Sequence, residues 1–332
     1  MRYFQVIAIL LVFSIPLFTL QLDTRIIFII AFFVLSLYSV FIRNFIQDLQ
    51  ARNPVTIFFL LFLLASTIST AFSIDHEQSL FTLITFLSCF IIFTSARTIF
   101  PGFESKLKIV YALSFTTFIL SIISLNNTLL HYVNRDPAGL SFMWNYYGHN
   151  HLSALLIFAI PLSIFLWGKS KLAILYSIFL AIILFFTFGI GSIISLLITA
   201  IVFLLFFWKV APAKKAIIAA TLITSSTILL IGLINSNRDF GLNKKPSSSF
   251  RDRTMLWKDS FRNGLAKPLT GWGLDTFRFI DRNGNIKEFT PNKSYSLSFP
   301  MQAINDSGIL GFISTLGLMG SIVLKGLRYI RR

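Results

Sequence analysis

The sequence has too few charged residues for a water-soluble globular protein. Only 13% of its residues are charged, about half the usual fraction, while 55% are hydrophobic. Cysteine is almost absent, since Cys89 is the single one among 332 residues, and this excludes a disulfide scaffold. The 38 phenylalanines exclude a disordered tail protein. This composition predicts an all-α, polytopic integral membrane protein.

Side chains that bind metals are also scarce. The chain has four His and 13 Asp and Glu residues. The segments expected outside the membrane contain no paired carboxylates and no His/Cys cluster with the spacing of metal ligands. We therefore expect no metal site and no cofactor.

The formal net charge of +16 arises from 29 Lys and Arg residues. On a soluble protein this charge would suggest a nucleic-acid partner, but a basic patch needs a soluble face on which to lie. Most of these cations instead fall in short gaps between apolar runs, where they set the orientation in the membrane. We expect contacts with membrane lipids and none with nucleic acid.

Apolar runs of roughly 20 residues, the length that crosses a bilayer, recur along the chain. They predict about ten transmembrane helices. These lie near residues 4–20, 26–42, 55–72, 79–95, 109–125, 152–167, 172–188, 191–208, 216–234 and 302–324.

Lys and Arg alternate between successive gaps. About fifteen lie in one set of gaps, which includes both termini, and only Arg25 and Arg135 lie in the short gaps of the other set. Because cytoplasmic loops carry the excess of Lys and Arg, we expect a multi-pass protein of the cytoplasmic (inner) membrane with both termini in the cytoplasm.

Four segments follow from this topology. Residues 1–125 hold the N-terminal transmembrane helices and 126–234 the central ones. Residues 235–301 form one large extracytoplasmic loop, and 302–332 hold the final helix and a basic cytoplasmic tail. The loop carries twelve Lys and Arg against six Asp and Glu. Loops of this length escape the positive-inside rule, so its charge needs another explanation.

Part of this loop has helical periodicity. Residues 250–262 place apolar side chains at near-helical spacing, with Ser249 as the expected N-cap and Gly264 as the expected end. Such a cationic, amphipathic helix beside a membrane suits anionic lipid headgroups, a lipid phosphate or pyrophosphate, or a protein surface. Further on, residues 281–285 predict a hairpin turn.

Several short motifs surround the loop. Arg253-x-x-x-Trp257 precedes the run KPLTGWGLDTF, which spans residues 267–277 and contains a Pro-Leu-x-Gly-x-Gly pattern. Residues 306–311 read acidic-x-Gly-x-x-Gly, and residues 148–154 begin a central helix around Asn150. In this order, over roughly 145–325, the motifs resemble those of the O-antigen ligase and O-antigen polymerase superfamily of bacterial envelope proteins.

The resemblance implies a chemistry. It implies a membrane glycosyltransferase that moves a glycan from a polyprenyl-pyrophosphate carrier to a hydroxyl of a glycan, lipid or protein acceptor. The transfer would take place on the outer face of the cytoplasmic membrane, without a metal. Arg side chains would stabilise the charge on the leaving pyrophosphate. Two family residues are missing: Ile190 stands where ligases have an Arg, and no His follows His151, although ligases have one near the end of the loop.

The cationic candidates come from this resemblance. Arg253 is the leading candidate for a catalytic, phosphate-contacting residue, against the alternative of a solvated or headgroup-binding Arg. Arg251 and Arg135 are further candidates for binding the substrate. Trp257 is a substrate-binding candidate too, although a packing or interface anchor is the commoner role of such a Trp.

The polar candidates have structural alternatives. His149 and His151 are candidate catalytic bases, and the alternative is a pair of interfacial residues. Asn150 would bind substrate or cap the helix that follows. Gly271 and Gly273 would allow a tight, substrate-binding turn. Asp306 would orient a substrate hydroxyl or, as is commoner, cap the final helix.

Two functions from other classes stay open. A catalytically silent relative that binds lipid-linked glycan would explain both missing residues. A membrane transporter of envelope lipid or polysaccharide would need ionisable residues within the membrane, and the predicted spans have almost none. Among enzymes, the missing Arg and His favour a polymerase-like or divergent member over a lipid A core ligase.

Overall fold

The computed structural model describes residues 53–133, 149–166, 171–186, 192, 195–198, 246–280, 286, 296 and 298–330. These residues form helices and no strand, apart from one isolated antiparallel bridge between Ile280 and Ile286. The all-α prediction is thus confirmed for the described part of the chain. The bridge flanks the predicted hairpin turn at 281–285, which lies outside the described residues.

Three described helices are long and apolar enough to cross a membrane by length and composition. They cover Pro54–Ala71, Phe103–Asn126 and Phe299–Arg328, and two shorter apolar helices cover Leu152–Ile164 and Leu172–Leu184. The predicted spans at 4–20, 26–42, 191–208 and 216–234 lie wholly or largely outside the described residues. The count of ten therefore stays a prediction.

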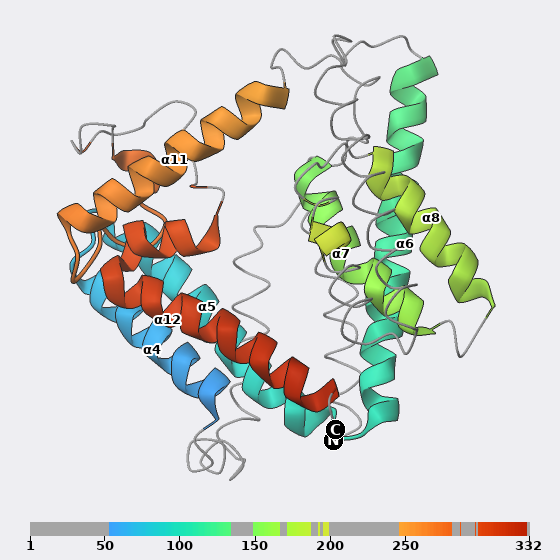
Figure 1. Ribbon diagram of the computed structural model, residues 1–332, viewed down its shortest axis with the longest axis horizontal. Helices are drawn as coiled ribbons and strands as arrows, with labels where there is room; N and C mark the ends of the chain where they lie inside the picture. Colours follow the sequence, from blue (N-terminus) through green and yellow to red (C-terminus); the bar gives the residue numbers. More distant parts are fainter. Residues whose placement is uncertain are drawn as a thin grey trace, which may run out of the picture. The chain divides into compact units, whose positions relative to one another are not determined.

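The described helices belong to two compact units. The first contains α6 (Phe103–Val133), α7 (His149–Phe165) and α8 (Leu172–Phe186). The second contains α4 (Pro54–Ala71), α5 (His76–Ile99), nearly all of α11 (Pro246–Ala266), the 3₁₀ helix η2 (Phe277–Phe279) and α12 (Phe299–Ile330) (Figure 1). The helix of the polar loop thus belongs to the same unit as the final helix and an early helical hairpin.

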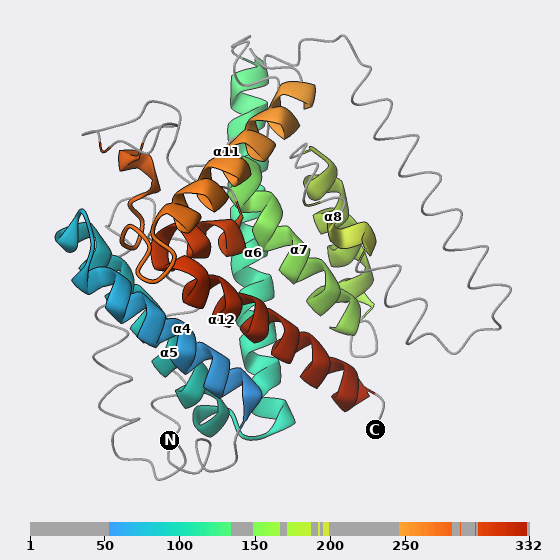
Figure 2. The same ribbon diagram turned by 60° about the vertical axis from the view of Figure 1, so that its left-hand side comes forward.

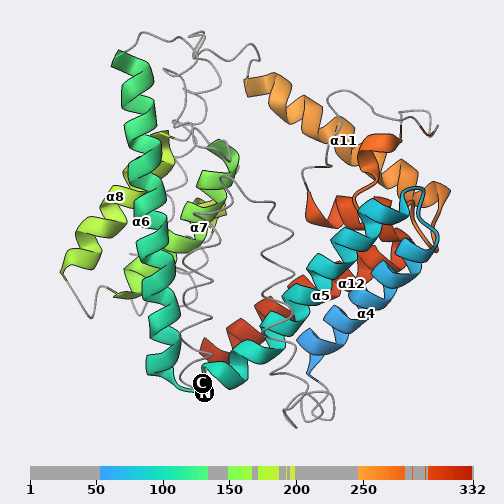
Figure 3. The same cartoon turned by 180° about the vertical axis from the view of Figure 1, so that it is seen from behind.

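In the first unit, α6 contacts both α7 and α8 (Figure 3). Leu156 and Leu180 are fully buried at the centre of an apolar cluster between α7 and α8. Hydroxyl groups tie the same helices together, since Ser163 and Ser177 lie 2.7 Å apart and the Tyr176 hydroxyl donates to the Ser114 carbonyl at 2.6 Å. Hydrogen bonds of this kind are expected between helices in an apolar solvent.

Helix α6 is longer than the predicted span at 109–125. It continues through Asn126 and Asn127 to Val133, and α7 already begins at His149. The stretch 126–151, between the predicted spans at 109–125 and 152–167, therefore begins and ends as helix. The apolar residues Leu129 and Leu130 continue the helical pattern, which outweighs the weak helix propensity of the two asparagines.

In the second unit, α12 packs along α4, and α4 packs on α5 (Figures 1 and 2). Asn53 caps α4 by accepting from the Val55 N–H at 3.3 Å. Phe62 of α4 contacts the ring of Phe86 at 4.9 Å between centroids and that of Phe299 at 5.8 Å. This aromatic cluster joins α4, α5 and the first turn of α12.

Glycine permits the closest helix contacts of this unit. A Cβ at Gly264 of α11 would lie 2.5 Å from the carbonyl oxygen of Ile304 in α12. The expected end of this helix at Gly264 was therefore wrong: α11 continues to Ala266, and the glycine serves the close approach. The expected cap at Ser249 was also wrong, because α11 begins at Pro246, and proline suits the first helical position.

Replacing Gly264 by Ala tests this contact. Ala is the better helix former by about 1 kcal/mol, yet we expect Gly264→Ala to lower the thermal stability of the purified protein, because overpacking costs about 1–3 kcal/mol. Gly320→Ala in α12 is the matched control, since a Cβ there has no atom within 4 Å, and it should be neutral or stabilising. Equal melting temperatures for the two variants would contradict the close approach.

Candidate functional site

The candidate site of the second unit is built around a segment that follows α11. This segment, Lys267–Thr276, is called the strap below, and it contains the Pro-Leu-x-Gly-x-Gly pattern. A turn forms first, since the Gly271 N–H donates to the Lys267 carbonyl at 2.9 Å. The strap then runs between α12 and the α4–α5 turn, where the Ile74 N–H donates to the Trp272 carbonyl at 3.1 Å.

Helix α12 is broken where the strap meets it. Ser307 and Gly308 have non-helical backbone angles, with φ of 65° at Gly308. In a continuous helix the Ile309 N–H would donate to the Asn305 carbonyl. Here it donates to the Pro268 carbonyl at 2.8 Å instead, and the Asn305 carbonyl accepts from the Trp272 N–H at 3.1 Å.

The break thus exchanges hydrogen bonds of the helix for hydrogen bonds to the strap. The Asp306 carbonyl takes part as well, because it accepts from the Gly273 N–H at 3.2 Å and from the Ser69 hydroxyl of α4. Buried backbone groups must be paired, so the strap and the break require each other.

Both strap glycines are required by this geometry. Gly271 and Gly273 have φ of 66° and 110°, which side chains disfavour. A Cβ at Gly271 would clash with the Asp306 carbonyl, and one at Gly273 would clash with the Ser73 hydroxyl. The predicted tight turn is present, and close packing accounts for both glycines.

The Asp306 carboxyl is the centre of the polar contacts. It is buried, and it accepts from the Asp275 N–H at 3.0 Å, from the Gln302 amide at 2.8 Å and from the Asn305 amide at 2.9 Å. Asp275, at φ 59°, also accepts from the Gln78 amide of α5. Asp306 therefore holds the strap to α12, and its place is at a break inside the final helix rather than at a cap.

Trp272 and Asn263 connect α11 to the same cluster. The indole N–H of Trp272 donates to the Asn263 carbonyl at 2.8 Å, and the Asn263 amide donates to the Asn305 side chain at 3.1 Å. The Lys267 ammonium lies 4.1 Å from the centroid of the Trp272 ring. Sequence reasoning missed Asn263 and Asn305, although an Asn inside an apolar helix was a signal for a buried polar contact.

Arg253 and Trp257 lie one turn apart on α11, on the N-terminal side of Asn263. Both side chains are half-buried. The Nε atom of Arg253 and the indole nitrogen of Trp257 are buried and have no hydrogen-bond partner in the part of the chain that the structure describes. A buried donor without an acceptor is costly, so both atoms point to an acceptor from outside these residues.

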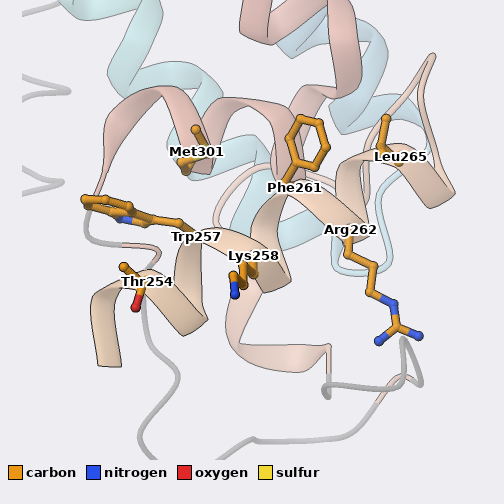
Figure 4. A pocket seen from close by; sticks show the side chains of 7 residues that line it. All are labelled: Thr254, Trp257, Lys258, Phe261, Arg262, Leu265 and Met301. Carbon is orange, nitrogen blue, oxygen red and sulfur yellow. The ribbon is translucent and has the colours of Figure 1, made fainter. Parts of the chain in front are cut away.

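An open pocket of about 470 Å³ lies on the face of α11 that carries Trp257 (Figure 4). Its walls combine apolar side chains with two cations. The lining residues are Thr254, Trp257, Lys258, Phe261, Arg262, Leu265 and Met301. Arg253 is not among them.

The candidate bases belong to the first unit. His149, Asn150 and His151 form the first turn of α7, while their side chains lie outside what the structure describes. Close to this turn, the Ser192 hydroxyl donates to that of Ser153 at 2.8 Å. This bond brings the start of α7 to Ser192, which follows Ile190 by two positions in the sequence.

Two other predicted site residues are not described by the structure. These are Arg135 and the side chain of Arg251. Among the described residues, no group of three or more His, Cys, Asp and Glu side chains could hold a metal ion.

Residues 175–316 match the family model described as O-antigen ligase. This part of the chain is therefore similar to the O-antigen ligase and polymerase superfamily, and the match confirms the resemblance inferred from the motifs. Together with the apolar helices, the match indicates an integral membrane protein. No curated protein and no solved structure matches the chain.

The matched region contains one set of candidate residues and omits another. It includes Arg253, Trp257, the strap and Asp306. It begins in α8, after the start of α7, so that His149 and His151 lie outside it. The superfamily pattern in this region thus coincides with the strap, the break in α12 and helix α11.

Substitutions at Asp306 test whether it holds the strap. Asp306→Ala removes the buried acceptor of three donors, and each donor left buried and unpaired costs about 1–3 kcal/mol. We expect a large loss of thermal stability in detergent, and a smaller loss for Asp306→Asn, which keeps one acceptor oxygen. Asp75→Ala, which removes only the cap of α5, should cost about 1 kcal/mol. Wild-type stability of Asp306→Ala together with lost glycan transfer would instead assign Asp306 to the substrate.

Proposed function

We propose that this protein transfers or polymerises a glycan carried on a polyprenyl pyrophosphate, at the outer face of the cytoplasmic membrane. The observation that carries the proposal is Arg253 on the loop helix, whose buried Nε atom has no hydrogen-bond partner among the described residues, within the region that matches the O-antigen ligase family model. A guanidinium offers several N–H donors in a fork that matches phosphate oxygens.

The chemistry follows from the charge of the leaving group. The acceptor hydroxyl oxygen attacks the anomeric carbon of the glycan, the bond from that carbon to the pyrophosphate oxygen breaks, and the hydroxyl proton passes to a base. Negative charge then accumulates on the pyrophosphate, where a positioned Arg stabilises it. We propose that Arg253, with Arg251 and Arg135 as further cations, replaces a metal ion in this role.

The proposed base is one of the two histidines at the start of α7. A neutral imidazole can accept a hydroxyl proton near pH 7. His149 and His151 flank Asn150, and the neighbouring Ser153 contacts Ser192, which lies two positions after Ile190, where ligases of the family have an Arg. The acceptor would be a hydroxyl on a glycan, a lipid or a protein.

One further function is favoured by a specific observation. Ile190 replaces the ligase Arg, and no His follows His151. A relative that binds lipid-linked glycan without transferring it would tolerate both changes. The two functions differ in whether the protein itself forms a glycosidic bond.

Deleting the gene and restoring it by complementation tests the proposal. On gels, the deletion strain should show a surface glycan that is shorter or no longer attached to lipid. The wild-type gene should restore the normal glycan. Arg253→Ala should not restore it, and Arg253→Lys should restore it in part, because Lys keeps the charge and loses the bidentate geometry.

Two controls show whether a defect of Arg253→Ala comes from the lost contact, from the lower net charge or from a lower amount of protein. Lys108→Ala removes an exposed cation from α6 and should restore the glycan fully. Each variant should reach wild-type levels in the membrane fraction. Full restoration by Arg253→Ala would favour the silent relative, and normal glycans in the deletion strain would contradict both functions.

The base is tested by single and double substitutions of His149 and His151 to Gln. Removing a general base lowers a rate by about 10²–10⁴-fold, so one single variant and the double variant should lose transfer of a labelled glycan from its lipid carrier in isolated membranes. Binding of the carrier should persist. Wild-type transfer rates in the double variant would place the base elsewhere.

A further inference from the structure

The pocket on α11 is separate from the role proposed for Arg253. Six of its lining residues form one stripe along α11, at positions 254, 257, 258, 261, 262 and 265, and this spacing places them on one face of the helix. In Figure 4 the charged groups of Lys258 and Arg262 point to one side, and Phe261, Leu265 and Met301 lie on the other. No acidic residue lines the pocket.

The pocket lies at the end of a helix that can cross a membrane. Met301 belongs to the first turn of α12, and Phe299–Arg328 is apolar enough to span a bilayer. Large apolar side chains that line the pocket are exposed, namely Phe261 at 46% and Leu265 at 51%. Exposed apolar side chains next to cations, at the end of a membrane helix, are typical of the headgroup level of a bilayer.

Trp257 adds an unpaired donor to this surface. Its buried indole nitrogen has no hydrogen-bond partner among the described residues. Buried Trp N–H groups normally have a partner, and Trp at a membrane interface combines an apolar ring with a polar contact. A ligand for this pocket should therefore contain an apolar chain, an uncharged acceptor oxygen and a negative charge.

We propose that the α11 pocket binds an anionic phospholipid of the surrounding bilayer. The phosphate lies beside Lys258 and Arg262, an ester oxygen accepts from Trp257, and an acyl chain runs along Phe261, Leu265 and Met301. The volume of about 470 Å³ is within the roughly 300–1,000 Å³ of small-molecule sites. The site fixes α11 at the membrane surface, and it does not depend on the proposed function.

Quenching of Trp257 fluorescence by brominated lipids tests the site in the full-length protein reconstituted into vesicles. The contribution of Trp257 is the difference between the wild type and Trp257→Phe, which keeps an aromatic ring. At equal mole fractions, brominated phosphatidylglycerol should quench Trp257 far more strongly than brominated phosphatidylcholine. Two cations near the headgroup should favour the anionic lipid by roughly thirtyfold.

The preference for the anionic lipid should depend on the two cations that line the pocket. Lys258→Gln with Arg262→Gln should equalise quenching by the two lipids, and native mass spectrometry should show less phosphatidylglycerol retained. Lys106→Gln with Lys108→Gln, an equal loss of exposed charge on α6, should change neither result.

Three outcomes would overturn the proposal. Equal quenching of the wild type by both lipids would remove the anionic preference. Absence of quenching by either lipid would leave a protein-docking surface. Displacement of brominated phosphatidylglycerol by polyprenyl phosphate, but not by unbrominated phosphatidylglycerol, would assign the pocket to the glycan carrier.

Discussion

The exchange of backbone hydrogen bonds at the break in α12 is the interaction on which the second unit depends. The Ile309 N–H leaves its helical partner for the Pro268 carbonyl, and Trp272 takes the acceptor that Ile309 leaves. Without the other, neither the strap nor the broken helix would have partners for all of its buried backbone N–H and carbonyl groups. The Asp306 carboxyl adds three acceptor contacts at the same point.

This arrangement fixes the end of α11. Asn263 and Trp272 join the end of α11 to the broken helix, and Gly264 brings α11 against Ile304. Because the end of α11 is held in this way, the positions of Arg253 and Trp257 on it are set by helix geometry. The loop helix can then present preorganised donors to an anionic ligand, which is what stabilisation of a leaving pyrophosphate requires.

Sequence reasoning reached the fold class, the family and a helix in the loop, because these depend on local periodicity and on short motifs. It placed the ends of that helix at Ser249 and Gly264, and both were wrong, because Pro246 and the contact with Ile304 decide them. It could not show that Gly271, Gly273 and Asp306 meet one another. That meeting depends on contacts between distant segments and on a break in α12, which the apolar run predicted at 302–324 does not reveal even though it contains Asn305 and Asp306.

The central claim is that the strap holds α11 so that Arg253 contacts the pyrophosphate of the carrier lipid. The most direct measurement is an experimental structure of the protein with a polyprenyl-pyrophosphate-linked sugar bound. The account predicts phosphate oxygens within hydrogen-bond distance of the Arg253 guanidinium, with the contacts between the strap and Asp306 intact. A pyrophosphate bound away from Arg253, or an Arg253 paired with an acidic side chain, would contradict it.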